Sequence, residues 1–245
     1  MKIERFYLDD VPVTTYEIED GKKKPLVYFF HGFTGNRDAN IMERGEVLAQ
    51  KGFFVVAIDA YLHGERQTAY AKGRTNQEKY EDIIDVVMHT AQDAKRLYHK
   101  YFKHNPHIAN HAYYAYGVSM GSAISFYLAT IDPQLKALAA LVCFPSFVAY
   151  YQTRKAQYKW KEDFIYQRRL AYYELHDPLI HYKRLLHTHL FMAIGEHDEV
   201  VPNHFAKALH EKLPESTLKS YDTGHISTPE MLADSYAYLV EKAGL

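Results

Sequence analysis

The feature that most constrains this fold is an apolar stretch, residues 112–116, followed at once by Gly117-Val-Ser119-Met-Gly121 and then by a helical pattern. A serine at a sharp turn between a strand and a helix has a strained backbone, which brings neighbouring atoms close together. The positions two before and two after it must then be small, and both are glycine here. The turn also puts the hydroxyl at a helix N-terminus, which favours negative charge. The pattern predicts Ser119 as a nucleophile; the alternative is a turn serine that only caps a helix.

Two later loops offer the groups that would activate this serine. A serine hydroxyl needs a neighbouring base to take its proton, and the base needs a third group to fix its tautomer. Asp198 and His225 each follow an apolar run of strand length, and the order Ser, Asp, His is the one that enzymes with this serine turn use. Glu199 is the fallback for the acid. The alternative for His225 is a surface loop histidine.

The same chemistry needs hydrogen-bond donors for a negatively charged oxygen, and removing one such donor costs about 3–4 kcal/mol. We expect the first donor to be the backbone N–H of Met120, directly after the nucleophile. We assign the second to the backbone N–H of Phe33, in the loop His31-Gly-Phe-Thr-Gly35. His31 is expected to pack or hydrogen-bond beneath that loop. A second motif with Asp59 and His63 is expected to shape the pocket rim, with a catalytic part as its alternative.

Apolar runs of strand length alternate with helical segments along the chain, which predicts a mainly parallel sheet covered by helices on both faces. An antiparallel hairpin is expected first, from residues 5–8 and 13–18. The strands expected after it are 26–30, 53–58, 112–116, 137–142, 190–194 and 218–221. The helices expected between them are 42–50, 77–101, 119–131, 203–212 and 229–242.

Residues 146–186 interrupt this alternation and are dense in Tyr, His, Arg and Lys. We interpret them as a small helical cap inserted into a single domain that spans residues 1–245; the alternative is a surface excursion without a ligand role. Aromatic residues of the cap could line an acyl or alcohol pocket or simply form core: Tyr150, Tyr151, Trp160, Phe164 and Tyr173. The substrate-binding candidates are Phe33, Tyr150 and Trp160.

Composition excludes several classes of function. The balance of 29 Lys+Arg against 30 Asp+Glu gives no electrostatic support to a nucleic-acid partner. No stretch approaches the roughly 20 apolar residues that span a bilayer, and the first residues lack the apolar core of a signal peptide, so we expect no membrane partner and a cytoplasmic location. Cys143 is the single cysteine, which excludes an intramolecular disulfide and suggests a buried structural thiol.

The 15 histidines raise the alternative of a metalloenzyme. The candidate ligands are His187 with His189, or His104 with His107 and His111. Neither set has an accompanying group of carboxylates at metal-binding spacing. We therefore expect neither a metal nor a cofactor.

The motifs HGFTGN, DAYLHGER, GVSMGS, GEHDEVVP and DTGHISTPE together resemble the α/β-hydrolase superfamily from about residue 26 onward. Within it, the chain is similar to small bacterial carboxylesterases of the YjfP-like, dienelactone-hydrolase and prolyl-oligopeptidase-related clan. The resemblance implies an α/β-hydrolase fold, a triad of Ser119, Asp198 and His225, oxyanion donors at Phe33 and Met120, and short-chain acyl esters as typical substrates. Dienelactone hydrolases proper use a cysteine nucleophile, where this chain has serine.

These features together predict a serine carboxylesterase that acts on a small-molecule ester through an acyl-enzyme on Ser119. One alternative is a peptidase or amidase, but such relatives usually filter peptides with a propeller domain that does not fit in this chain. Another is a ligand-binding protein that has lost its chemistry, against which the intact triad residues argue. Exposed aromatic residues on the cap or the last helix could form a homodimer face, and the oligomeric state stays open.

Overall fold

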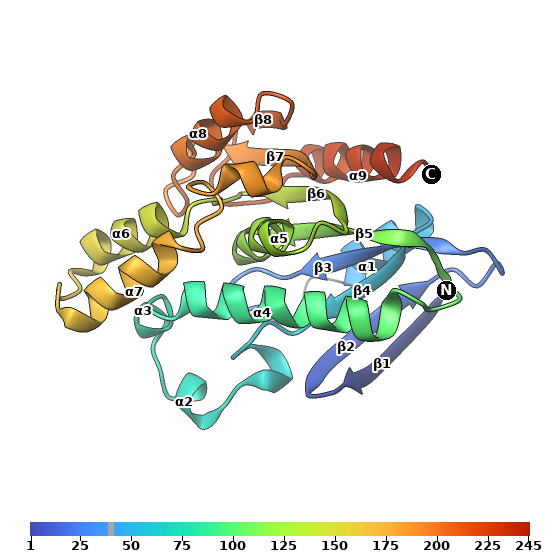
Figure 1. Cartoon of the computed structure of the whole chain (residues 1–245), viewed down its shortest axis with the longest axis horizontal. Helices are drawn as coiled ribbons and strands as arrows, with labels where there is room; N and C mark the ends of the chain where they lie inside the picture. Colours follow the sequence, from blue (N-terminus) through green and yellow to red (C-terminus); the bar gives the residue numbers. More distant parts are fainter. Residues whose placement is uncertain (39–41) are drawn as a thin grey trace.

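The computed structural model describes residues 1–38 and 42–245, with the side chains of residues 42–44 and 110–111 left aside. The described strands form one eight-stranded sheet in the order β1-β2-β4-β3-β5-β6-β7-β8 (Figure 1). β1 and β2 form the predicted antiparallel hairpin, and β2 also runs antiparallel to β4, while the other neighbouring strands are parallel. The strands are β1 (Lys2–Leu8), β2 (Val11–Glu17), β3 (Lys24–Phe30), β4 (Phe54–Ile58), β5 (Ile108–Val118), β6 (Leu135–Leu141), β7 (His189–Gly195) and β8 (Thr217–Tyr221).

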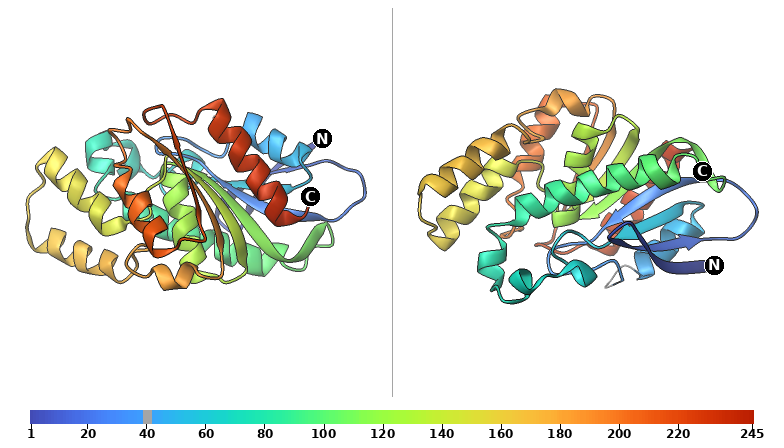
Figure 2. Two further views of the ribbon diagram at one scale, coloured as in Figure 1. Left: turned by 90° about the horizontal axis from the view of Figure 1, so that it is seen from above. Right: turned by 60° about the horizontal axis from the view of Figure 1, so that its bottom comes forward.

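Helices cover both faces of the sheet, as predicted for an α/β-hydrolase fold (Figure 2). Two of them, α4 (Ile83–Leu97) and α5 (Met120–Ile131), pack on one face, and α1 (Met42–Gln50) and α9 (Pro229–Ala243) pack on the other. The remaining helical segments are η1 (Gly64–Arg66), α2 (Ala69–Lys72), α3 (Asn76–Lys79), η2 (Tyr98–Phe102), α6 (Phe147–Tyr158), α7 (Phe164–Glu174), η3 (Tyr182–Leu185) and α8 (His204–Lys212). Among the described residues, no helix has both the length and the apolar composition that crossing a bilayer requires.

Burial on both faces explains why the central strand β3 is apolar at every position from Leu26 to Phe30. Side chains of a strand point alternately to the two faces of the sheet. Leu26, Tyr28 and Phe30 pack with α4 and α5, whereas Val27 and Phe29 pack with α1 and α9. All five are at most 1% exposed. A strand covered on both faces therefore needs a continuous apolar run.

The prediction of one helix over residues 77–101 was wrong, because the chain breaks there into α3, α4 and η2. Thr75 starts α3 with a capping box in which its side chain and that of Glu78 each bond the other's backbone N–H. After the break, the Asp82 carboxylate accepts hydrogen bonds from Arg74 and, at 3.0 Å, from Arg169 of α7. Tyr80 lies in the break itself.

Residues 146–186 contain α6, α7 and η3, and the first two helices lie side by side beyond the end of the sheet that is farthest from the chain termini (Figure 1). A buried carboxylate, Asp177, joins the two ends of this segment. It accepts hydrogen bonds from the Ser146 hydroxyl at 2.9 Å and from the Val148 N–H at 2.8 Å. The pairing of Arg169 with Asp82 fastens α7 to the start of α4 as well.

The turn from β5 to α5 has the strained backbone that the sequence predicted. Ser119 has φ 54° and ψ −115°, a conformation that side chains disfavour. A Cβ at Gly117 would lie 2.1 Å from the Gly121 carbonyl oxygen, and a Cβ at Gly121 would lie 2.1 Å from the Phe30 carbonyl oxygen. Backbone therefore packs directly on backbone at this turn, and neither position has room for a side chain.

The loop after β3 is fastened from beneath by His31, Arg37 and Asp59. The His31 Nε2 accepts a hydrogen bond from the Ala60 N–H at 3.0 Å, so its Nδ1 carries the proton and donates to the Gly32 carbonyl oxygen at 2.8 Å. Arg37 donates to the fully buried Asp59 carboxylate from its backbone N–H and from Nη1, both at 2.7 Å. The expectation that His31 bonds beneath this loop is confirmed.

Cys143 is 1% exposed, as expected for a structural thiol, and burial raises its pKa to about 12. A thiol with such a pKa stays protonated at neutral pH and is a poor nucleophile. Cys143, which follows β6, therefore contributes to the packing of the hydrophobic core.

Replacing Gly117 by alanine tests the close packing at the turn. Because the new methyl group would clash with a backbone carbonyl, we expect Gly117→Ala to lower the free energy of unfolding by about 1–3 kcal/mol. The matched control is Gly73→Ala, whose Cβ would meet the Ala69 carbonyl oxygen at an ordinary 3.5 Å and should change stability by less than about 0.5 kcal/mol. Urea unfolding of both variants measures the difference, and equal effects would contradict the packing argument.

Acid should destabilise the protein through His31. Burial lowers the pKa of His31 from its ordinary 6.5 to about 3, so the folded chain holds it neutral while the unfolded chain binds a proton below 6.5. The stabilisation is complete above that pH and is lost as the pH falls toward 3, amounting to about 2 kcal/mol between pH 7 and pH 5. Urea unfolding at pH 7, 6 and 5 should show a shallower decline for His31→Gln than for the wild type, and identical slopes would refute this role.

Candidate active site

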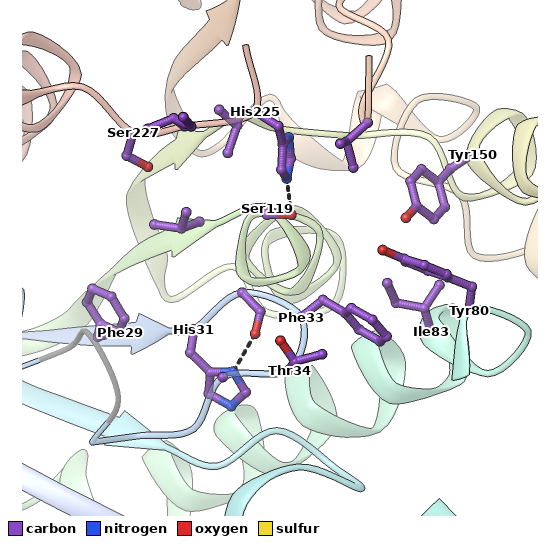
Figure 3. A pocket seen from close by; sticks show the side chains of 16 residues that line it. Phe29, His31, Phe33, Thr34, Tyr80, Ile83, Ser119, Tyr150, His225 and Ser227 are labelled. Atoms are coloured by element: carbon purple, nitrogen blue, oxygen red, sulfur yellow. Dashed lines mark hydrogen bonds between the residues drawn. The ribbon is translucent and has the colours of Figure 1, made fainter. Parts of the chain in front are cut away.

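The three side chains predicted as a triad meet at the carboxyl end of the sheet, although each comes from a different loop. Ser119 follows β5, Asp198 follows β7 and His225 follows β8. The Ser119 Oγ lies 2.9 Å from the His225 Nε2 (Figure 3), and the His225 Nδ1 lies 2.7 Å from the Asp198 Oδ2. The parallel strands bring these loops together because their carboxyl ends share one edge of the sheet.

Asp198 is held by backbone donors that leave one of its oxygens for the histidine. Its side chain is 2% exposed, and its Oδ1 accepts hydrogen bonds from the N–H groups of Val200 at 2.9 Å and Val201 at 2.8 Å. The other oxygen faces His225. Glu199, the fallback for this position, is exposed.

The loops that carry the acid and the histidine are also joined to each other. The His197 N–H donates to the Thr223 carbonyl oxygen at 3.0 Å, and the Glu196 N–H donates to the Tyr221 carbonyl oxygen at 2.9 Å. These bonds extend the pairing of β7 with β8 past the ends of both strands. The distance between the acid and the histidine is thus set by main-chain geometry.

The two predicted oxyanion donors lie on either side of the serine. Met120 begins α5, where the first N–H groups have no partner within the helix. The Ser119 N–H is already used, because it donates to the Leu141 carbonyl oxygen at 2.9 Å. Phe33 sits in a turn closed by the Gly35 N–H and the Gly32 carbonyl oxygen at 3.1 Å, and a Cβ at Gly32 would lie 3.8 Å from the Ser119 Cβ. The turn therefore passes directly beside the serine.

A cavity of about 560 Å³ opens above Ser119 and His225 (Figure 3). No Asp, Glu, Lys or Arg lines it in the part of the chain that is described. Its walls are mostly apolar or aromatic, with the side chains of Phe29, Phe33, Tyr80, Ile83, Val118, Val142, Tyr150, Val200 and Ile226. The composition suits a small ligand without a net charge.

The aromatic residues proposed for substrate binding divide into two groups. Phe33 and Tyr150 line the cavity, but Trp160 does not. The Trp160 ring packs instead on Tyr151 at 5.3 Å and on Tyr158 at 6.0 Å, within the 146–186 segment. Of the remaining candidates from that segment, Tyr151 and Tyr173 are buried in its core and Phe164 is exposed.

Sequence reasoning missed Tyr80 and Ile83 as cavity residues. Both were placed inside one continuous helix, whereas the break before α4 turns them toward the serine. The only local signal was the capping box at Thr75 and Glu78, which marks the start of a short helix. Where that helix ends depends on contacts distant in the sequence.

Asp59 and His63 lie behind the cavity wall and not in it. Asp59 is occupied by Arg37, and its Oδ2 also accepts a hydrogen bond from the Glu65 N–H at 2.9 Å. The His63 ring contacts the Phe33 ring at 5.8 Å, and burial lowers its pKa. Both residues support the wall from outside.

The histidines that suggested a metal site in the sequence do not form a metal-binding cluster among the described residues. No three His, Cys, Asp or Glu side chains among these residues are grouped as metal ligands. The side chain of His111, one of the candidates, lies outside the described residues.

The sequence pattern of the dienelactone hydrolase family matches residues 13–225. YitV of Bacillus subtilis strain 168, which its name presents as a proposed esterase, is 27% identical over 154 residues. That alignment spans 62% of this chain and 58% of YitV, so it leaves over a third of that relative unmatched.

Solved structures share the fold at low sequence identity. TT1662 from Thermus thermophilus superposes with a TM-score of 0.72 at 19% identity, over 100% of both chains. A cold-adapted esterase from an Arctic intertidal metagenomic library gives 0.69 at 17%, over 98% of this chain and 93% of the esterase. A puromycin-hydrolysing peptidase of Mycobacterium tuberculosis gives 0.76 at 17%, over 99% of this chain but only 39% of the peptidase.

The family match extends from the second strand to the loop of the histidine and includes every residue of the Ser119, Asp198 and His225 arrangement. The serine turn, the sheet order and the helices on both faces agree with it. The chain belongs to the dienelactone hydrolase family of the α/β-hydrolase superfamily.

Proposed function

We propose that this protein is a carboxylesterase that cleaves small, short-chain acyl esters with Ser119 as nucleophile. The observation that carries the proposal is the chain of contacts from the Ser119 Oγ to the His225 Nε2 and from the His225 Nδ1 to Asp198, at the floor of the cavity. A carboxylate at Nδ1 keeps the proton on that nitrogen. The Nε2 lone pair then faces the serine hydroxyl and can accept its proton.

The reaction proceeds through an acyl-enzyme. The Ser119 Oγ attacks the ester carbonyl carbon as its proton passes to the His225 Nε2, and the N–H groups of Met120 and Phe33 bind the resulting oxyanion. The tetrahedral intermediate collapses when the C–O bond to the alcohol breaks and His225 returns the proton to the leaving oxygen. Water, deprotonated by His225, then attacks the acyl carbon. The C–O bond to Ser119 breaks, His225 returns the proton to the Ser119 Oγ, and the acid leaves.

The cavity favours an ester over a peptide. A free α-amino group of a peptide would need a carboxylate partner, and none of the described lining residues is acidic. A peptidase shares the fold, and this chain aligns with 39% of its length. We therefore retain peptide or amide hydrolysis as the second candidate only on the ground of that shared fold.

We also propose a cytoplasmic location. The chain has a single cysteine, which is buried. A protein without intramolecular disulfides suits a reducing compartment. The substrate would then be an intracellular small molecule.

Covalent labelling tests the nucleophile. A fluorophosphonate should phosphonylate Ser119 alone, seen as one added mass on the intact protein and located by peptide mapping. Ser119→Ala should lose the adduct and at least about 10³-fold in kcat on p-nitrophenyl acetate, butyrate or octanoate, with the shortest esters cleaved fastest by the wild type. Ser227→Ala, which changes another serine of the cavity, should still be labelled. Labelling or unchanged turnover in Ser119→Ala would rule out the assignment.

A second pair of variants tests the acid. Asp198→Asn should lower kcat about 10³–10⁴-fold, because an amide cannot hold the histidine in the required tautomer. Its neighbour Glu199 is exposed, and Glu199→Gln should remain near the wild-type rate. Steady-state kinetics on p-nitrophenyl butyrate compares them. A larger loss in Glu199→Gln would transfer the role to that residue.

A further inference from the structure

One wall of the cavity is a stack of aromatic rings that encloses a guanidinium group. The Phe33 ring stacks on the Tyr80 ring at 4.5 Å, and the Arg154 guanidinium lies 4.7 Å from the centre of the Tyr80 ring. The same guanidinium lies 4.7 Å from the centre of the Tyr150 ring, which in turn stacks on Phe144 at 4.2 Å. The stack joins the loop after β3, the break before α4, helix α6 and the segment after β6.

Arg154 holds this wall in place from behind. It is 3% exposed and does not line the cavity. Its Nη2 donates to the Val200 carbonyl oxygen at 2.7 Å, and its Nη1 donates to the Gln157 side chain. Both terminal nitrogens of the guanidinium are thus held by hydrogen bonds. Because this fixed group lies against both tyrosine rings, the rings have little freedom to turn.

The hydroxyl groups of Tyr80 and Tyr150 point into the cavity (Figure 3). Burial raises the pKa of both phenols, although the charge of Arg154 and, for Tyr150, a hydrogen bond from the Arg154 side chain act in the opposite direction. Both therefore remain protonated at neutral pH and can donate hydrogen bonds. On the side of the cavity, the other residues of this wall include the apolar side chains of Phe33, Ile83 and Val200.

A polar donor in an apolar pocket selects for a ligand that pairs with it, because an unpaired donor is costly once the ligand excludes water. Two such donors on one wall suit a neutral oxygen better than a carboxylate. A carboxylate would require a guanidinium or an ammonium within reach, and Arg154 lies behind the rings. The chemistry on this wall is that of hydroxyl and ether recognition.

We propose that Tyr80 and Tyr150 form a specificity subsite that binds a hydroxyl or ether oxygen of the substrate outside the reacting ester group. The substrate is then an ester whose alcohol or acid part carries such an oxygen. This inference rests on the proposed esterase function and narrows its substrate class. It assigns to the two phenols a binding role distinct from that of the serine and the histidine.

Esters that differ only in their hydroxyl groups test the subsite. On the alcohol side, 1-monobutyrin is compared with propyl butyrate; on the acid side, ethyl 3-hydroxybutyrate is compared with ethyl butyrate. For the wild type we expect kcat/KM to favour the hydroxylated ester of at least one pair by about 10- to 100-fold. Tyr80→Phe and Tyr150→Phe keep the ring stack and should each reduce that ratio by about 3- to 10-fold, with the double variant close to no preference.

The control variant is Tyr158→Phe, which lies on α6 and stacks on Tyr80 at 5.6 Å but does not line the cavity. It should keep the wild-type ratio. Ethyl hydrogen succinate, an anionic ester of similar size, separates a neutral from a charged ligand. A higher kcat/KM for it than for all four neutral esters would overturn the inference.

The outcomes separate this inference from the proposed function. If Ser119 takes up the fluorophosphonate and the esters are cleaved, but the wild type and the double variant show the same ratios, the subsite is refuted and the esterase proposal stands. If Ser119 is labelled and no member of either pair is cleaved, the subsite is likewise refuted. If Ser119 is not labelled and no ester is cleaved, both fail.

Discussion

The structure depends on one steric constraint, the contact of backbone with backbone at the turn that carries Ser119. The strand β5, the helix α5 and the end of β3 meet there, with no space for a side chain at Gly117 or Gly121. This contact directs the serine hydroxyl away from the sheet and aligns the start of α5 with it. It also brings the end of β3 close, so that the loop holding Phe33 passes beside the serine. The candidate nucleophile and both candidate oxyanion donors thus follow from a single packing requirement.

The loops around the site are ordered by buried carboxylates that accept backbone N–H groups. Asp59 fastens the loop after β3, Asp177 closes the 146–186 segment, and Asp198 orders its own loop while it contacts His225. Hydrogen bonds to a charged acceptor are stronger than those between neutral groups, so one carboxylate can organise several residues. The rigid sheet edge and these anchors together set the distances within the site.

The cavity combines elements of different origin. Ser119 and His225 follow the ends of strands, whereas Tyr150 comes from the 146–186 segment and Tyr80 from the break before α4. A fold of this kind keeps its reacting groups on the sheet and varies the segments above them. The proposed recognition of an oxygen by the two tyrosines therefore belongs to the part of the chain least determined by the fold.

The sequence alone determined the sheet with helices on both faces, the strained turn and the three residues that meet on it. These follow from short-range rules: alternation of side chains along a strand, the volume allowed beside a sharp turn, and the order of loops after parallel strands. The tertiary structure decided that the helix predicted over residues 77–101 breaks at Tyr80 and that Tyr80, and not Trp160, faces the cavity. The break coincides with the pairing of Asp82 with Arg169, which lie 87 residues apart, and of Arg74 with the same carboxylate. Local periodicity carries no information about such a long-range ion pair, so only the folded chain could reveal which residues form this wall of the cavity.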